Sequence, residues 1–143
     1  MELPDSLLES SIEERKIYFF TKNATIGIPN HMHVCIRLKD RVLLFSTCTS
    51  QTDTVYRLGQ FKGWDMNTFP CFKKNEQNKF DRELTFVNCN NIIQCDKDEF
   101  LKFIKNGSII PLDGTLNERD MNLISNGIQK SITVAQEIKE LFL

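Results

Sequence analysis

Apolar residues gather in short runs along the first half of the chain, and polar, turn-forming residues separate these runs. Residues 16–22 are rich in aromatic and β-branched side chains, which favours a first strand. Residues 31–38 and 41–49 are two further apolar runs joined by two polar residues, and together they predict a central β-hairpin. Residues 84–95 predict another strand.

Helical spacing of apolar residues occurs at three places. Residues 5–14 predict a short N-terminal helix. Asp96 and Glu99 form a capping pair at the start of a second short helix. Thr115 and Glu118 form a capping box, and the apolar positions after them repeat every three or four residues to the end of the chain. This last pattern predicts one long C-terminal helix.

The remaining segments carry weaker patterns. Residues 50–80 are polar with scattered aromatic side chains, and within them only residues 68–72 resemble a short strand. A structureless stretch of this length is unusual in a compact domain, so we expect a functional loop with small elements. Residues 108–112 predict a short extended piece, and Asp113-Gly114 predicts a turn after it.

Length and composition favour one globular domain spanning residues 1–143. Apolar residues make up 41% of the chain and charged residues 26%, which is close to the globular average. The eleven phenylalanines need a packed interior, since exposed aromatic surface is unfavourable. The order of strands and helices predicts the α+β class.

Targeting signals are not apparent in the sequence. No apolar run approaches the ~20 residues that cross a bilayer, and the N-terminus has no basic flank before an apolar stretch. The five cysteines are scattered and odd in number, which is typical of reduced thiols. We therefore expect a cytoplasmic protein without a membrane segment or a secretion signal.

Three segments resemble the MazF/PemK-type toxins. Residues 31–38 match in position the family strand that opens with Arg-Pro, residues 45–51 resemble the strand that ends in Thr-Ser, and residues 86–96 resemble the family stretch Val-Arg-Cys-Asp-Gln. The resemblance covers about residues 16–141. It implies a small SH3-like β-barrel of the MazF/CcdB kind, with a short N-terminal helix and a long C-terminal helix. It also implies a metal-independent endoribonuclease of a toxin-antitoxin system, which needs no cofactor, acts as a homodimer and is neutralised by an antitoxin protein.

The resemblance transfers the family's residues only in part. Thr49 and Ser50 match the Thr-Ser pair, and the Arg-Pro opening falls near His31. The family's catalytic Arg and Asp fall on Asn88 and Asn90, and asparagine can hold a phosphate or a base but cannot accept a proton at neutral pH. These departures put catalysis in doubt, while the two asparagines stay candidates for contacts to substrate.

The sharpest chemical feature is the pair His31 and His33. Two residues apart on a strand, they are expected on one face, and histidine suits both proton transfers of metal-free RNA cleavage. The alternative is a polar strip on the barrel, or one histidine bonded near the core. A metal site is a weaker alternative, since no acid or cysteine lies at a convincing ligand spacing.

Further candidates are predicted to bind the substrate. Thr49 and Ser50 can donate to phosphate oxygens, while Cys48 between the threonines is expected to point inward; a plain turn is the alternative reading. Arg37 and Arg57 can stabilise charge on phosphorus, or else lie solvated on the surface.

Residues 61–80 interleave cations with aromatic side chains, a mixture that can stack unpaired bases and follow a phosphate backbone. The residues of this mixture are Phe61, Lys62, Trp64, Phe69, Phe72, Lys73, Lys74, Lys79 and Phe80. Because several of the phenylalanines are needed for the core, we select Trp64, Lys73 and Lys74 as the binding residues. Cys89 and Cys95 are expected to be buried structural thiols.

The leading hypothesis is therefore a toxin-like endoribonuclease that cuts single-stranded RNA, with His31, His33 and Thr49 in the catalytic roles. The alternative is a non-catalytic barrel that binds a protein or an RNA, or poisons a target as the related gyrase-directed toxins do, because Asn88 and Asn90 replace the family's Arg and Asp. A third, weaker hypothesis is a subunit that docks on a partner through its acidic N-terminal helix.

Overall fold

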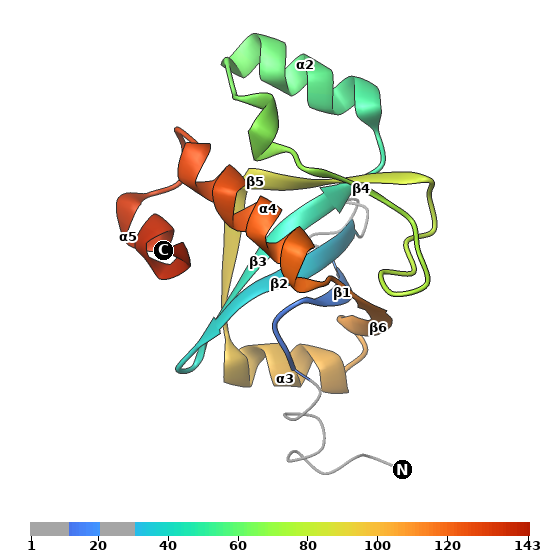
Figure 1. Ribbon diagram of the computed structural model, residues 1–143. Helices are drawn as coiled ribbons and strands as arrows, with labels where there is room; N and C mark the ends of the chain where they lie inside the picture. Colours follow the sequence, from blue (N-terminus) through green and yellow to red (C-terminus); the bar gives the residue numbers. More distant parts are fainter. Residues whose placement is uncertain (1–11, 21–30) are drawn as a thin grey trace.

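The computed structural model describes residues 12–20 and 31–143 (Figure 1). Its strands are β1 (Lys16–Phe20), β2 (His31–Lys39), β3 (Val42–Thr49), β4 (Cys71–Lys73), β5 (Leu84–Asp96) and β6 (Ile110–Thr115). Its helices are α2 (Thr52–Lys62), η1 (Met66–Thr68), α3 (Lys97–Lys105), α4 (Glu118–Lys130), α5 (Gln136–Lys139) and η2 (Glu140–Phe142). Among the helices of these described ranges, none is long and apolar enough to cross a membrane.

The strands form a six-stranded antiparallel sheet in the order β4-β5-β3-β2-β1-β6. The predicted hairpin is confirmed: β2 and β3 pair from His33 opposite Thr47 to Lys39 opposite Val42. Asp40 turns the chain between them with a φ of 55°, in the left-handed region that aspartate tolerates. The predicted strands at 16–22 and 84–95 are also confirmed, as far as the described residues reach.

The sheet curls because its ladders are interrupted by bulges. The largest interruption lies between β3 and β5, where Ser46 pairs with Ile92 and Cys48 pairs with Val87. Thr47 alone therefore spans the stretch that residues 88–91 span on β5. Extra residues on one strand bend it and increase its twist. Smaller register shifts occur in β1 and β2, and the result is a barrel-like half-cylinder (Figure 1).

The two edges of the sheet approach each other at one end. The loop after β4 reaches β6, the other edge strand, and the backbone N–H of Thr115 donates to the carbonyl of Gln77 at 3.0 Å. Gly114 of β6 allows this approach, because a Cβ there would lie 1.9 Å from the carbonyl oxygen of Asn78. Residues 113–114 were expected to form a turn, and this prediction was wrong: both belong to β6.

Each face of the sheet buries its own apolar cluster. One cluster contains Val34, Leu44 and Val87, and α4 covers it with Ile124 and Ile128. The other cluster is covered by α3 on the opposite face, with Tyr18, Phe45 and Phe100 at its centre (Figure 1). Alternation of side chains along β1, β2 and β3 produces this division, since successive residues of a strand point to opposite faces.

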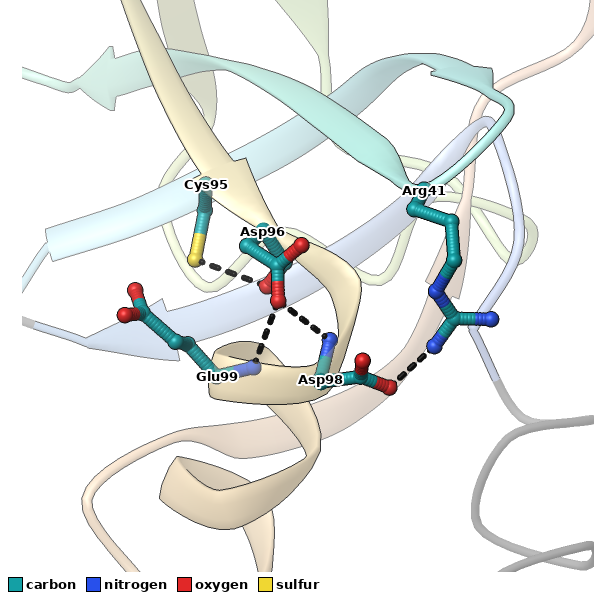
Figure 2. Close-up of polar contacts among 5 residues, drawn as sticks. All are labelled: Arg41, Cys95, Asp96, Asp98 and Glu99. Carbon is teal, nitrogen blue, oxygen red and sulfur yellow. Dashed lines mark hydrogen bonds and ion pairs between the residues drawn. The ribbon is translucent and has the colours of Figure 1, made fainter.

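The start of α3 is fixed by the predicted cap (Figure 2). The carboxylate of Asp96 accepts hydrogen bonds from the backbone N–H groups of Asp98 and Glu99, at 3.0 and 3.2 Å. Arg41 in the hairpin turn forms an ion pair with Asp98, and the N–H of Lys97 donates to the carbonyl of Arg41 at 2.8 Å. The hairpin turn and α3 are therefore held to each other by side-chain and backbone contacts.

The terminal helix is shorter than predicted. α4 begins after Asn117, whose side chain accepts from the N–H of Asp120, whereas Thr115 lies in β6. The helix ends at Ser131, where the backbone becomes extended at φ −69° and ψ 136°. The chain then turns back through α5 and η2. The prediction of one long C-terminal helix was wrong, because a buried polar contact outweighs the continuing apolar pattern.

That polar contact is made by Asn90, which is 2% exposed in the interrupted part of β5. Its amide nitrogen donates to the hydroxyl of Thr68 at 2.7 Å, and its side-chain oxygen accepts from the hydroxyl of Ser131 at 2.9 Å. The hydroxyl of Thr133 donates to the backbone carbonyl of Asn90 at 2.6 Å. A single asparagine thus joins η1, β5 and the end of α4.

Two other segments differ from expectation. Residues 52–62 form the helix α2, which the sequence did not indicate, because Val55 is its only fully buried side chain and Gly59 lies in its interior. Val55 of α2 forms a small buried cluster with Phe69 and Phe86, and Trp64 packs against this cluster. Of the helix predicted over residues 5–14, residues 5–11 lie outside the described residues; residues 12–13 have no regular structure and residues 14–15 form a turn, so this end of the segment is not helical.

We expect Asn90→Ala to lower the free energy of unfolding by about 2–4 kcal/mol, because the hydroxyls of Thr68 and Ser131 would lose their buried partner. The measurement is urea denaturation followed by circular dichroism. The matched control is Asn91→Ala, next in sequence but exposed, which should change stability by less than about 0.5 kcal/mol. Equal stability of the two variants would contradict the proposed role of Asn90.

Candidate functional site

A cleft of about 570 Å³ opens where β2 begins and β3 ends. Its lining comes from all parts of the sheet that the curl brings together: the strands β1, β2, β3 and β6, the turn after β3, and the loop before β5. The lining residues are Phe19, His31, Met32, Cys48, Thr49, Ser50, Gln51, Lys79, Asp81, Arg82 and Leu112.

Three of the predicted site residues line the cleft: His31, Thr49 and Ser50. His31 is the exposed first residue of β2, while Thr49 ends β3 and Ser50 follows it. The hydroxyl oxygen of Thr49 accepts a hydrogen bond from the N–H of Gln51 at 3.2 Å. Since this bond uses an oxygen lone pair, the hydroxyl proton of Thr49 stays available to an acceptor in the cleft.

The loop before β5 contributes three charged residues to the cleft: Lys79, Asp81 and Arg82, all exposed. Lys79 belonged to the mixture of cations and aromatic side chains but was not chosen from it, and Asp81 and Arg82 were not singled out. The available signal was the pair of asparagines Asn75 and Asn78, which favours a tight loop directly before these charges.

The cleft also has apolar lining residues. These are Phe19, Met32 and Leu112, together with Cys48, which is 2% exposed, so the prediction that this thiol points inward is confirmed. Burial raises the pKa of Cys48 to about 12. The thiol is therefore protonated at neutral pH and is a poor nucleophile, because the thiolate is the reactive form.

The two histidines have different environments. His33 is 1% exposed, and its ring stacks on Phe20 with centroids 3.9 Å apart and an interplanar angle of 14°. His31 pairs with Phe20 at the end of the ladder, where the strand leaves the core. The face of β2 that carries both histidines therefore lies at the cleft at His31 and in the interior at His33. His33 is thus a histidine near the core, which was the alternative to a catalytic role.

Asn88 and Asn90, on which the resemblance places the family's catalytic residues, do not line the cleft. Asn88 accepts a hydrogen bond from the N–H of Asn90 at 2.9 Å, through its side-chain oxygen. The amide of Asn90 is occupied on both atoms by Thr68 and Ser131. Both asparagines shape the interrupted part of β5, so we do not include them in the candidate site.

The other predicted binding residues are dispersed over the surface. Arg37 lies with its guanidinium 5.8 Å from the ring centre of Phe142, and Arg57 is exposed on α2. Trp64 is half-buried, with the ammonium of Lys62 5.1 Å from its ring centre. Lys73 and Lys74 are exposed at the end of β4 and directly after it. None of these side chains lines the cleft.

The cysteines are free thiols in differing environments. Cys89 is buried, as predicted, and packs beneath α4 with its sulfur 3.5 Å from the carbonyl of Ile124. Cys95 is only half-buried, so the prediction of a buried thiol there was wrong. Within residues 12–20 and 31–143, no group of three or more His, Cys, Asp or Glu side chains is arranged to hold a metal ion.

The lining of the cleft therefore combines an imidazole, a carboxylate, two hydroxyls and two cations with several apolar side chains. Such groups can bind an anion, donate hydrogen bonds to it and move protons beside it. Neither the comparison with models of known protein families nor the search among curated proteins returned a match.

Substitution of the two histidines by alanine should change the stability of the protein by different amounts. We expect His33→Ala to lower the free energy of unfolding by about 2–4 kcal/mol, because it removes a fully buried ring from its stack on Phe20. We expect His31→Ala to change it by less than about 0.5 kcal/mol, since the side chain is exposed. Urea denaturation of both variants distinguishes the two roles, and a large loss in His31→Ala would contradict them.

Proposed function

We propose that this protein is a toxin-like, metal-independent endoribonuclease that cleaves single-stranded RNA. The observation that carries the proposal is the cleft in which His31, Thr49 and Ser50 lie together with Lys79 and Arg82. Metal-free cleavage needs proton transfer and positive charge near one phosphate, and this cleft offers both.

The proposed reaction is attack of an RNA 2′-hydroxyl on the adjacent phosphorus. Asp81 is the carboxylate that lines the cleft in the described part of the chain, and it accepts the proton of the 2′-hydroxyl. His31 gives a proton to the departing 5′-oxygen, which leaves as a hydroxyl. The products are a 2′,3′-cyclic phosphate and a 5′-hydroxyl end. With His33 in the core, Asp81 takes the second proton-transfer role.

The charge that grows on the phosphate oxygens needs partners of its own. Lys79 and Arg82 supply positive charge, and the hydroxyls of Thr49 and Ser50 in the same cleft supply hydrogen-bond donors. Donors that are already in place stabilise such charge without rearrangement during the reaction.

The arrangement of elements supports a MazF/PemK-like fold as part of the proposal. A curled antiparallel sheet is followed by α4, and the strand with Cys89 leads into α3, Gly107 and β6 in the order on which the resemblance depends. His31, near the family's Arg-Pro position, and Thr49-Ser50, at its Thr-Ser position, line one cleft.

The partners also remain a proposal. We include a homodimer, an antitoxin protein and a cytoplasmic site of action, which the family resemblance implies.

A second candidate function is binding without cleavage. The observation that favours it is that expected catalytic groups are missing from the cleft. His33 is buried in the core, and the asparagines at the family's Arg and Asp positions form hydrogen bonds that stabilise β5. A cleft with one imidazole can bind an anion even if it cleaves RNA slowly.

The proposal predicts that purified protein, freed of any partner, cuts a mixed-sequence single-stranded RNA in the presence of EDTA. His31→Ala and Asp81→Asn should each slow cleavage by about 100-fold or more, the range for a general acid or base. The measurement is gel analysis of end-labelled RNA, with 5′-hydroxyl ends as products. Lys102→Ala, exposed on α3, is the matched control and should retain full activity.

Two outcomes separate the candidates. Intact RNA after incubation with wild-type protein that still binds it would favour the binding module. Equal cleavage rates for wild type and His31→Ala would show that the assigned proton-transfer role is wrong.

A further inference from the structure

Lys79 has an unusual backbone for a lysine. Its φ is 53°, in the left-handed region that side chains with a Cβ seldom adopt, and it lines the cleft. Glycine is the residue that this conformation favours, because it has no Cβ to clash with the backbone. This chain has a lysine here, although the conformation costs energy. Strain of this kind clusters at functional sites, where the surrounding structure imposes it.

The surrounding structure holds the loop without using the Lys79 side chain. Asn78 is 2% exposed, and its side-chain oxygen accepts from the N–H groups of Asn75 and Phe80, at 3.0 and 3.1 Å. Its amide nitrogen donates to the carbonyl of Lys73 at 2.9 Å. The N–H of Lys79 itself donates to the carbonyl of Asn75 at 2.9 Å. The buried asparagine therefore ties both ends of the loop together.

Two further contacts fix the loop to the body of the protein. Phe80 is 4% exposed and belongs to the apolar cluster beneath α4. On the opposite side, Gly114 of β6 packs directly on the carbonyl of Asn78, and Thr115 bonds to Gln77. Lys79 thus projects from a rigid loop between two anchored residues. The packing of the loop accounts for the position of the Lys79 backbone, but it gives no role to the ammonium group.

Arg82 lies three residues further along and lines the same cleft, with Asp81 between the two cations. The three charges sum to +1, and the hydroxyls of Thr49 and Ser50 and the imidazole of His31 line the same cleft. An anionic group with several oxygens matches this set of groups, since cations and hydroxyls both interact with phosphate oxygens. Asp81 balances only one of the two cations, so a neutral ligand would leave the cleft with a net positive charge.

We propose that Lys79 and Arg82, presented by the loop that Asn78 locks, form a preorganised cradle for a backbone phosphate of single-stranded nucleic acid. The choice of nucleic acid as ligand rests on the proposed function, whereas the cradle requires binding and no cleavage. Because the loop is already ordered, binding loses little conformational freedom. The charge of Lys79 at this fixed point of the loop binds the ligand.

The test uses a single-stranded 2′-O-methyl oligoribonucleotide with a fluorescent label, which has backbone phosphates but no 2′-hydroxyl nucleophile. Binding is measured by fluorescence anisotropy over a series of salt concentrations. Lys79→Gly should weaken binding about 5-fold or more, and the slope of log affinity against log salt should fall by about 0.7, the value for one contact to a single strand. Arg82→Ala should behave in the same way.

Lys79→Gly should at the same time be as stable as wild type or more stable, because glycine relieves the left-handed strain. Asp81→Asn should tighten binding, since it removes a negative charge beside the phosphate. Lys130→Ala, exposed at the end of α4, is the matched control and should bind as wild type does.

Wild-type affinity and salt slope in Lys79→Gly would overturn the cradle, and so would an oligonucleotide that does not bind wild-type protein. A clear loss of stability in Lys79→Gly would show that the lysine is structural, which also overturns it. Binding through Lys79 without any cleavage of RNA would leave the cradle intact and refute the proposed endoribonuclease.

Discussion

The buried amide of Asn90 is the interaction on which most of the architecture depends. Residues 88–91 of β5 exceed the length of β3 opposite them, so this part of the strand cannot complete a regular ladder. Asn90 replaces the missing partners with bonds to Thr68 and Ser131, and its own carbonyl accepts from Thr133. Without such partners, buried polar groups in the interruption would be destabilising. The bend in β5 is thus stabilised by the segments that it contacts.

The same interruption determines where α4 lies. Gly127 is needed on the inner side of the helix, because a Cβ there would approach the carbonyl of Asn67 to 2.8 Å and the sulfur of Cys89 to 2.9 Å. Close contact at Gly127 places the end of α4 beside Asn90, where Ser131 stops the helix. The curl that follows from the bend brings the ends of β2 and β3 to the loop before β5. The cleft is a consequence of that curl.

The sequence predicted those elements whose signals are local. The hairpin, β5 and α3 follow from apolar periodicity and from the cap at Asp96, because each pattern is complete within a few neighbouring residues. The break at Ser131 could not be predicted in this way, since its cause lies in Asn90, far away along the chain. α2 was missed because it buries little of its own surface, and so has a weak apolar stripe.

Prediction of the candidate site had the same limit. Thr49, Ser50 and His31 were identified from strand ends and residue chemistry, whereas Lys79, Asp81 and Arg82 reach the cleft through the folded loop. Alternation along a strand correctly grouped His31 with His33 on one face. Alternation does not show where along that face the core begins, and Phe20 covers His33 but leaves His31 exposed.

The two buried asparagines, Asn78 and Asn90, therefore stabilise the fold, whereas other residues, with exposed charges, line the cleft. Each satisfies backbone or hydroxyl groups without bringing a charge into the interior, which would be far more costly to bury. The cations stay at the rim, on a loop that one of these asparagines fixes. Where the resemblance places a catalytic Asp, this chain has a structural amide, and its charged groups lie on a different segment. Any activity of the cleft must therefore depend on the loop before β5 and on His31, and not on the strand position that the resemblance marks.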